Sequence, residues 1–183
     1  MNIATIGRGK VGSALASRWR RAGHSVATLG RDGGEVSAAA VLLVAVPSFA
    51  IADALGRVKG LNGQLAIDVT NASTGRGHAF ESLTHEVKAF VGGPAAKAFN
   101  LQHHLLYDRV DAERKRPSDL FAADVDAHTT VARLIRDAGF DPVYVGGLEK
   151  ARALEDLMQL FGAVRIQNGG LPHFHRFAKP GDL

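Results

Sequence analysis

The chain has no cysteine, one tryptophan and two tyrosines among its 183 residues. The lack of cysteine excludes disulfides, a thiol nucleophile and thiolate metal sites, and it agrees with a reducing compartment. No apolar run is long enough for a membrane helix, and no positively charged flank followed by an apolar segment marks a signal sequence. We therefore expect a cytoplasmic protein that makes no membrane contact.

The chain also lacks a large excess of charge of one sign: it has 22 basic and 18 acidic residues, which gives a formal net charge of +4. The basic residues are scattered and are not interleaved with aromatic side chains, so nucleic-acid binding is not expected. A modest positive balance suits a protein that holds a multiply charged phosphate ligand. With 46% apolar residues, the length fits a single domain over residues 1–183.

The first twelve residues, MNIATIGRGKVG, contain a glycine motif of the G-x-G-x-x-G type. An apolar strand is expected at residues 3–6, followed by Gly7, Gly9 and Gly12 and then a helix over residues 11–22. In a dinucleotide-binding unit, the first glycine makes a tight turn, the second lets a pyrophosphate approach, and the third lets the helix pack on the strand. The helix N-terminus offers N–H groups to the phosphates. The alternative is that these glycines only shape a turn.

A second strand is predicted at residues 25–29, and Gly30, Arg31 and Asp32 follow it. At this position an acidic side chain binds the ribose 2′-hydroxyl of NAD, whereas an arginine accepts the 2′-phosphate of NADP. Arg31 comes first and no acid ends the strand, so we favour NADP(H). If Asp32 faces the ribose instead, the preference reverses.

Strands and helices alternate along the remaining chain, which predicts an α/β fold with a doubly wound, mainly parallel, Rossmann-like sheet. Further strands are expected at residues 41–46, 64–69, 94–100, 120–122 and 142–145, and helices at residues 49–58, 78–91, 125–138 and 148–166. Residues 35–40 are too few for a helical crossover and another strand. We therefore predict that the sheet is trimmed by one strand after the second strand, on the adenine side.

Ligands in such sheets lie outside the carboxyl ends of the strands. This rule predicts that Pro47, Ser48, Thr70 and Asn71 form the walls of the nicotinamide half. Ser48 is also expected to cap the helix that follows it. Asp68 stands within a strand and is interpreted as structural rather than as a base.

Three segments have two interpretations each. Residues 72–77 are either a connecting loop or a second phosphate cradle, and the lack of a Lys-Ser or Lys-Thr ending favours the loop. The polar residues 103–119 form either a solvated loop or a mobile flap over the cofactor. The helix at residues 148–166 carries a wide apolar stripe, which packs either on its own sheet or against a second copy in a homodimer.

No residue is predicted as a catalytic acid or base. A Tyr-x-x-x-Lys pair is lacking, and the eight histidines have neither helical i, i+4 spacing nor an obvious carboxylate partner, so no metal site is expected. Residues 1–183 leave no room for a separate substrate domain, so we expect the second reactant to sit on the same sheet. A flat redox cofactor that exchanges hydride with nicotinamide needs positioning more than acid–base help.

Several segments together resemble the F420-dependent NADP oxidoreductases, a family that includes the NADPH-dependent F420 reductases. The similarity spans nearly the whole chain. It is carried by residues 7–12, 30–31, 45–47, 67–71, 97–100, 138–143 and 147–155. The chain departs from the family's pattern in the short residues 35–40, in Ala123-Asp124 and in residues 102–116.

The resemblance implies NADP(H) as cofactor, F420 or a flavin as the second redox partner, and a homodimer. Carried over by position, it places Arg8 to Val11 at the pyrophosphate, Arg31 at the 2′-phosphate, Val46 and Pro47 beside the ribose, and Asn71 and Asn100 at the nicotinamide. Together with the motif and the strand ends, the predicted cofactor-binding residues are Gly7, Arg8, Gly9, Lys10, Val11, Gly12, Gly30, Arg31, Val46, Pro47, Ser48, Thr70, Asn71 and Asn100.

The sequence thus predicts an NADP(H)-dependent oxidoreductase that transfers hydride between nicotinamide and a flavin or F420-like acceptor. A non-catalytic NADP(H)-binding module, which senses the nucleotide or docks on a partner, is the alternative. An imine or small-carbonyl reductase is a third interpretation, and it needs a proton donor that the sequence does not reveal.

Overall fold

The computed structural model describes residues 1–72 and 79–181. Seven strands form one sheet in the order β2-β1-β4-β6-β7-β8-β9. All neighbours run parallel except β7 and β8, which are antiparallel. The strands are β1 Asn2–Ile6, β2 Ser25–Leu29, β4 Val41–Val44, β6 Leu65–Asp68, β7 Ala95–Lys97, β8 Ser118–Ala123 and β9 Asp141–Gly146. The predicted α/β fold with a mainly parallel sheet is confirmed.

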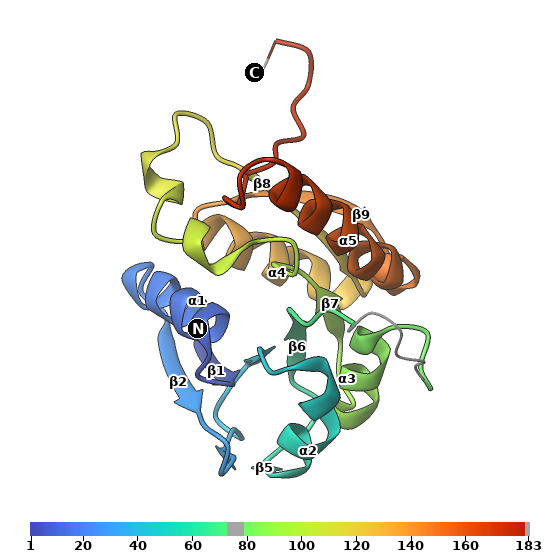
Figure 1. Cartoon of the computed structure of the whole chain (residues 1–183). Helices are drawn as coiled ribbons and strands as arrows, with labels where there is room; N and C mark the ends of the chain where they lie inside the picture. Colours follow the sequence, from blue (N-terminus) through green and yellow to red (C-terminus); the bar gives the residue numbers. More distant parts are fainter. Residues whose placement is uncertain (73–78, 182–183) are drawn as a thin grey trace.

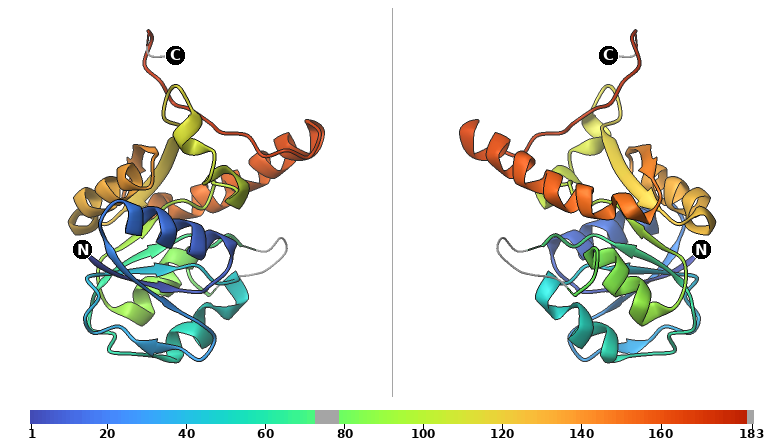
Figure 2. Two further views of the ribbon diagram at one scale, coloured as in Figure 1. Left: turned by 90° about the vertical axis from the view of Figure 1, so that its left-hand side faces the viewer. Right: turned by 90° about the vertical axis from the view of Figure 1, so that its right-hand side faces the viewer.

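Helices cover both faces of this sheet, as Figures 1 and 2 show. The α-helices are α1 Lys10–Arg21, α2 Ile51–Gly56, α3 Leu83–Val91, α4 Val125–Asp137 and α5 Ala151–Gln167, and the 3-10 turns are η1 Ser48–Ala50, η2 His104–Leu106, η3 Val110–Ala112 and η4 Leu148–Lys150. On one face, Trp19 of α1 and Leu134 of α4 share a core with alternate residues of the strands. On the other face, α2 and α3 enclose a second core, and α5 packs against β8.

Strand β2 lies at the edge of the sheet, as the short residues 35–40 predicted. The chain that would form a further strand instead contributes β3 (Gly34–Glu35), which pairs with β5 (Val58–Lys59) in a separate two-stranded sheet. A close approach fixes this turn: Gly33 has a φ of +75°, and a Cβ there would lie 2.0 Å from the Arg57 carbonyl oxygen. The predicted trimming of the sheet is therefore confirmed.

Two predicted helices are shorter than expected. The segment over residues 49–58 is the turn η1 followed by the six-residue helix α2, and Val58 belongs to β5. Ser48 does not cap either element through its side chain, so that prediction is wrong. The helix expected from residue 78 begins at Leu83, because the Ser82 side chain accepts a hydrogen bond from the His85 N–H and caps it.

The polar segment over residues 103–119 is packed in its first half and is not a solvated loop there. Leu106, Tyr107 and Val110 are buried in the core beneath α1 and α4. Buried Arg18 donates hydrogen bonds from its guanidinium to the Tyr107 carbonyl oxygen, at 2.7 Å, and to Asp111. Hydrophobic residues at three- to four-residue spacing anchor this stretch despite its charge.

Two sequence predictions concern a loop and the lack of membrane helices. Residues 73–77 of the predicted connecting loop lie outside the described residues. Within residues 1–72 and 79–181, no helix is both long enough and apolar enough to cross a membrane.

Candidate functional site

The glycine turn between β1 and α1 has the geometry that the motif predicts. Gly7 has a φ of +109°, and a Cβ on it would lie 2.3 Å from the Ala45 carbonyl oxygen. A Cβ on Gly12 would lie 2.4 Å from the Gly7 carbonyl oxygen, so α1 packs directly on the turn. A Cβ on Gly9, by contrast, would have no neighbouring atom within 4 Å. Gly7 and Gly12 are required by close packing, and Gly9 leaves open space for a ligand in front of the helix.

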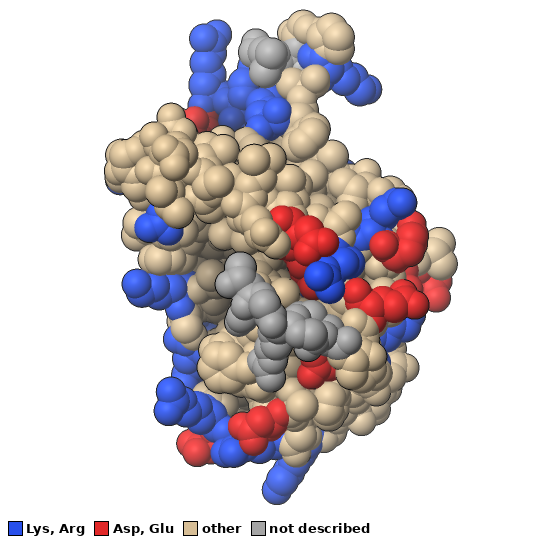
Figure 3. Space-filling model, turned by 45° about the vertical axis from the view of Figure 1, so that its right-hand side comes forward, with Lys and Arg blue, Asp and Glu red and all other residues tan. Residues whose placement is uncertain are grey.

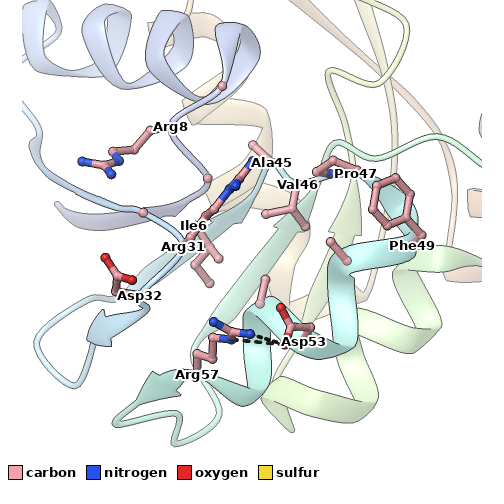
Figure 4. A pocket seen from close by; sticks show the side chains of 15 residues that line it. Ile6, Arg8, Arg31, Asp32, Ala45, Val46, Pro47, Phe49, Asp53 and Arg57 are labelled. Carbon is pink, nitrogen blue, oxygen red and sulfur yellow. Dashed lines mark hydrogen bonds and ion pairs between the residues drawn. The ribbon is translucent and has the colours of Figure 1, made fainter.

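This open space belongs to a cavity of about 840 Å³ at the carboxyl ends of β1, β2 and β4. We call it the arginine pocket, because Arg8, Arg31 and Arg57 reach it from three different elements (Figure 4). Its lining includes half of the predicted cofactor-binding residues, namely Gly7, Arg8, Gly9, Gly30, Arg31, Val46 and Pro47. Its size is that of a typical cofactor site.

The arginines are placed by short-range contacts. A Cβ on Gly30 would lie 2.5 Å from Arg8 Nη2, so the glycine makes room for that guanidinium. Arg57 is held by Asp53, whose Oδ1 accepts hydrogen bonds from Nη2 at 2.8 Å and from Nε at 3.1 Å. Guanidinium groups bind phosphate oxygens in a planar, bidentate manner, so this pocket suits a ligand with several phosphates.

Asp32 also lines the arginine pocket, beside Arg31. Arg31, which favours NADP, and Asp32, which favours NAD, therefore line the same cavity. Their positions alone do not decide between the two nucleotides, and the relative binding affinities do. Asp53 and Arg57 were not among the predicted site residues. Their i, i+4 spacing indicates an ion pair on a helix, but only the fold places that pair on the pocket.

The predicted residues outside this lining form other parts of the same strand edge. Lys10, Val11 and Gly12 begin α1, and Ser48 begins η1. Asn71 and Asn100, which lie 29 residues apart, meet directly: Asn71 Nδ2 donates to the Asn100 carbonyl oxygen at 2.8 Å, and Asn100 Nδ2 donates to Asn71 Oδ1 at 2.9 Å. The two residues that the resemblance assigns to the nicotinamide are thus brought together.

Thr70 and the asparagine pair adjoin four buried side chains, three charged and one a hydroxyl, which we call the buried network: Asp68, Thr84, Lys97 and Glu155. Lys97 Nζ lies 2.6 Å from Asp68 Oδ2, 2.6 Å from the Thr70 carbonyl oxygen and 3.1 Å from Glu155 Oε1.

Two further hydrogen bonds complete the buried network. Thr84 Oγ1 donates to Asp68 Oδ2 at 2.8 Å, and the Leu83 N–H donates to Glu155 Oε1 at 2.9 Å. Lys97 therefore links β7 to β6 and α5, while Asp68 and Glu155 extend the buried network to α3. Asp68 is engaged in structural contacts.

Sequence reasoning did not single out Lys97 or Glu155 as a pair. Each carries a charge at a position that faces inward, Lys97 in a strand and Glu155 on the packed side of a helix. An inward-facing charge predicts a buried partner, but it does not identify which residue that partner is.

Three buried polar atoms at this end have no hydrogen-bond partner among the described residues: Thr70 Oγ1, Asn100 Oδ1 and Glu155 Oε2. Buried polar groups normally have a partner. A hydroxyl, an amide oxygen and a carboxylate oxygen could orient a carboxamide, but Thr70 and Asn100 do not act as acids or bases at neutral pH.

A further buried acid, Asp119 on β8, supports this region from below. Burial raises the pKa of Asp119 to about 7. Its Oδ2 accepts a hydrogen bond from the Phe99 N–H at 3.0 Å, and its Oδ1 accepts one from Gln102 Nε2 at 3.1 Å. The carboxyl group is fully buried in these contacts, and it holds the backbone next to Asn100.

In the described part of the chain, no group of three or more histidine, aspartate or glutamate side chains is arranged to hold a metal ion. Of the histidines that the sequence drew attention to, His103 and His104 stack on each other near α1. His175 is half-buried against Phe161, and burial lowers its pKa to about 4.

Comparison with known proteins identifies solved structures that share this fold. No protein-family model matches the sequence, and no curated protein matches it. The crystal structure of an Arthrobacter sp. FB24 protein, whose provisional name is F420-dependent NADP reductase, has a TM-score of 0.83 at 20% identity, over 98% of this chain and 100% of that one. The chain has the fold of that protein. The resemblance expected from the motifs is thus confirmed at the level of the fold.

Two other solved structures agree. A hypothetical protein from Sinorhizobium meliloti is 27% identical over 81% of this chain and 86% of its own, with a TM-score of 0.65. The imine reductase from Myxococcus stipitatus, solved in complex with NADP+, is 17% identical with a TM-score of 0.65. The match covers 91% of this chain and 63% of that enzyme, so more than a third of the imine reductase has no counterpart here.

Proposed function

We propose that this protein is an NADP(H)-dependent oxidoreductase that transfers hydride between nicotinamide and a flavin or F420-like acceptor. The observation that carries the proposal is the glycine turn opening into the arginine pocket. Gly7 and Gly12 fit a backbone cradle that a Cβ would fill, and Gly9 leaves free space at the N-terminus of α1. A dinucleotide needs both features at the same place.

The residues present fit NADP(H) from end to end. Arg8, Arg31 and Arg57 would surround the phosphates of the adenosine half. Val46 and Pro47 would flank the ribose, and Thr70, Asn71 and Asn100 would orient the nicotinamide. NADPH would supply the hydride when bound, and these residues would hold and orient it.

The chemistry at the strand ends favours a flat redox acceptor. The residues assigned to the nicotinamide are amides and a hydroxyl, which do not exchange protons at neutral pH. Reduction of an imine or a carbonyl group requires a proton donor beside the hydride path, whereas a flavin or deazaflavin accepts hydride at a ring position and mainly requires alignment. This difference supports the flavin or F420-like class.

The proposal is tested by mixing the purified protein with NADPH and F420, FMN, FAD or a ferric chelate, each in turn. We expect NADPH oxidation with a deazaflavin or a flavin, and an at least tenfold lower kcat/KM for NADPH with Gly7→Ala, whose new Cβ would collide with Ala45. NADPH that stays reduced with every acceptor would rule out the activity.

A non-catalytic NADP(H) sensor is the second candidate. The observation in its favour is the direct hydrogen-bonded contact between Asn71 and Asn100, which closes the strand ends without presenting a proton donor. Tight NADPH binding that changes the oligomeric state, without turnover of any acceptor, would favour the sensor over the enzyme.

We also propose that the chain is one domain that acts as a cytoplasmic homodimer through the second half of α5. That half projects from the body of the molecule (Figure 2), and Figure 3 shows few charged side chains over it. Leu160, Val164 and Ile166 are 59%, 41% and 74% exposed. Analytical ultracentrifugation should give a dimer for the wild type and for Gln159→Glu, and a monomer for Ile166→Glu; a wild-type monomer would contradict the proposal.

A further inference from the structure

A second cavity, of about 290 Å³, lies between α5, the segment that follows it and the residues after β7. It shares no lining residue with the arginine pocket. Its walls are mostly apolar and include Leu101, Met158, Phe161 and Phe174. Arg165 and three histidines, namely His103, His173 and His175, also line it.

The second cavity adjoins the asparagine pair. Leu101 directly follows Asn100, and Asn100 Nδ2 donates to the carbonyl oxygen of Leu154 at 2.9 Å. Met158, one helical turn further along α5, lines the cavity. A molecule in this cavity would therefore lie next to the residues assigned to the nicotinamide.

Four basic side chains gather beside the cavity from three elements: Lys10 at the start of α1, His103 and His104 at the start of η2, and Arg165 near the end of α5. We call them the basic cluster. The rings of His103 and His104 lie 4.3 Å apart between centroids, and Arg165 Nη1 lies 3.1 Å from His103 Nε2. Among the described residues, no carboxylate forms an ion pair with any of the four.

The hydrogen bonding of His103 is incomplete. Two donors face its ring: the Leu105 N–H lies 3.3 Å from Nδ1, and Arg165 Nη1 lies 3.1 Å from Nε2. A neutral imidazole accepts a hydrogen bond at only one of its two nitrogens, so the ring cannot satisfy both donors. An anion beside Arg165 would supply the additional acceptor.

The electrostatics agree with this geometry. Burial first, and then the charges of His104, Arg165 and Lys10, hold the pKa of His103 below its usual value. Burial, followed by Lys10 and Arg165, does the same for the pKa of His104. All the charges that face these rings are positive, so an anion that enters would raise both pKa values.

We propose that the basic cluster binds the phosphate group of the second reactant, whose aromatic part occupies the adjoining apolar cavity. The inference rests on the proposed function, because it names the chemical class of the hydride acceptor: a phosphorylated redox cofactor, in preference to its unphosphorylated form. The phosphates of NADP(H) are assigned to the arginine pocket, whose lining contains none of the four residues of the basic cluster. Lys10 is the one member of the cluster that the resemblance also places near the pyrophosphate, so the tests below use His103, His104 and Arg165.

The anion site is tested first without any redox chemistry. Sulfate keeps its double negative charge over the pH range in which histidines titrate, so it serves as the probe. NMR titration, with signals assigned through His103→Gln and His104→Gln, should show the pKa of both histidines rising on addition of sulfate.

Arg165→Gln should weaken sulfate binding about tenfold, as expected for the loss of one charged hydrogen bond. Arg152→Gln lies about 20 Å away along the same helix and should change nothing. Histidine pKa values that sulfate leaves unchanged, or an equal response in Arg165→Gln, would overturn the proposal.

The source of the phosphate is tested next with FMN and riboflavin, which share a ring system and differ by one phosphate. The wild type should bind FMN at least tenfold more tightly than riboflavin, and this ratio should fall towards one in Arg165→Gln and His103→Gln. The affinity for NADPH should stay the same in both variants. Equal binding of the two flavins by the wild type, or a loss of NADPH affinity in place of FMN affinity, would overturn the assignment to the second reactant. Binding experiments need no turnover, so their failure is distinguishable from failure of the proposed activity.

Discussion

The arginine pocket and the buried network lie at the same edge of the sheet and are built in opposite ways. In the arginine pocket, Arg8, Arg31 and Arg57 are exposed and are positioned by glycines and a local ion pair. In the buried network, Lys97, Asp68 and Glu155 are fully buried and bonded to one another across four elements. Exposed charges remain available to a ligand, whereas buried charges that are already paired determine the position of the backbone.

We therefore expect the arginine pocket to determine ligand binding and the buried network to determine the stability of the fold. A change in the arginine pocket should alter ligand affinity and hardly alter the free energy of unfolding. A change in the buried network should do the reverse, because it leaves an uncompensated charge in the core. The following substitutions test this separation.

The largest effect is expected for Lys97→Met. It leaves the Asp68 and Glu155 carboxylates buried without their cation, and we expect a loss of about 3–5 kcal/mol in the free energy of unfolding, measured with urea. Lys88→Met is the matched control: Lys88 pairs with Asp124 at 2.7 Å but is 42% exposed, so about 1 kcal/mol at most should be lost. Equal losses in the free energy of unfolding of the two variants would contradict the expected difference between buried and exposed charges.

Asp119→Asn tests how a buried carboxyl group makes the free energy of unfolding depend on pH. The pKa of Asp119 is raised to about 7 in the folded protein, from 3.8 as its reference value. Between these values the folded state holds a proton that the unfolded state has lost, so this group makes the protein less stable as pH rises, by up to about 1.4 kcal/mol per pH unit. Below the lower value and above the upper one the effect is constant. In urea unfolding at pH 5, 6 and 7, the wild type should lose stability relative to Asp119→Asn, and parallel curves would show that the carboxyl group is already ionised at pH 5.

Gly7→Ala addresses the turn below the arginine pocket. The φ of +109° and the contact with Ala45 should together cost about 1–3 kcal/mol, and NADPH binding should weaken at least tenfold. Gly56→Ala in α2 meets no atom within 4 Å and should instead raise stability by about 0.5–1 kcal/mol. Unchanged NADPH affinity in Gly7→Ala would show that the glycine turn does not contribute to nucleotide binding.

Asp53→Asn should have the smallest effect on folding. Its pair with Arg57 is exposed on both sides and lies within one helical turn, so we expect a loss of about 0.3–0.5 kcal/mol in unfolding experiments. NADPH should still bind, because Arg57 remains charged. A loss as large as that of Lys97→Met would mean that the pocket is a structural element and not a binding surface.

The sequence predicted the arginine pocket better than the buried network, for a physical reason. Gly7, Gly9 and Gly12 act within one turn of chain, and Gly30 and Arg31 follow directly from the end of a strand. The short residues 35–40 were enough to predict the missing strand, since chain length limits what a crossover can contain. Such local constraints are visible without a fold.

The buried network depends on pairings that local patterns do not contain. Lys97 and Glu155 are separated by two strands and a helix, and only the packing of α5 on the sheet brings them together. Asn71 was predicted from its place at the end of a strand, whereas Asn100 was predicted only through the resemblance. The polar residues 103–116 concealed the apolar anchors of η2 and η3, because their many charges dominated the pattern of that segment.

The central claim, that the arginine pocket is an NADP(H) site, is tested most directly by titrating the protein with NADPH and NADH. The wild type should bind NADPH at least tenfold more tightly, and Arg31→Ala should lose about 1.5–3 kcal/mol of NADPH affinity while NADH affinity stays the same. Arg133→Ala, exposed on α4, should behave as the wild type. Tighter binding of NADH by the wild type, or an NADPH preference that survives in Arg31→Ala, would contradict the account and point to Asp32 as the residue that reads the ribose.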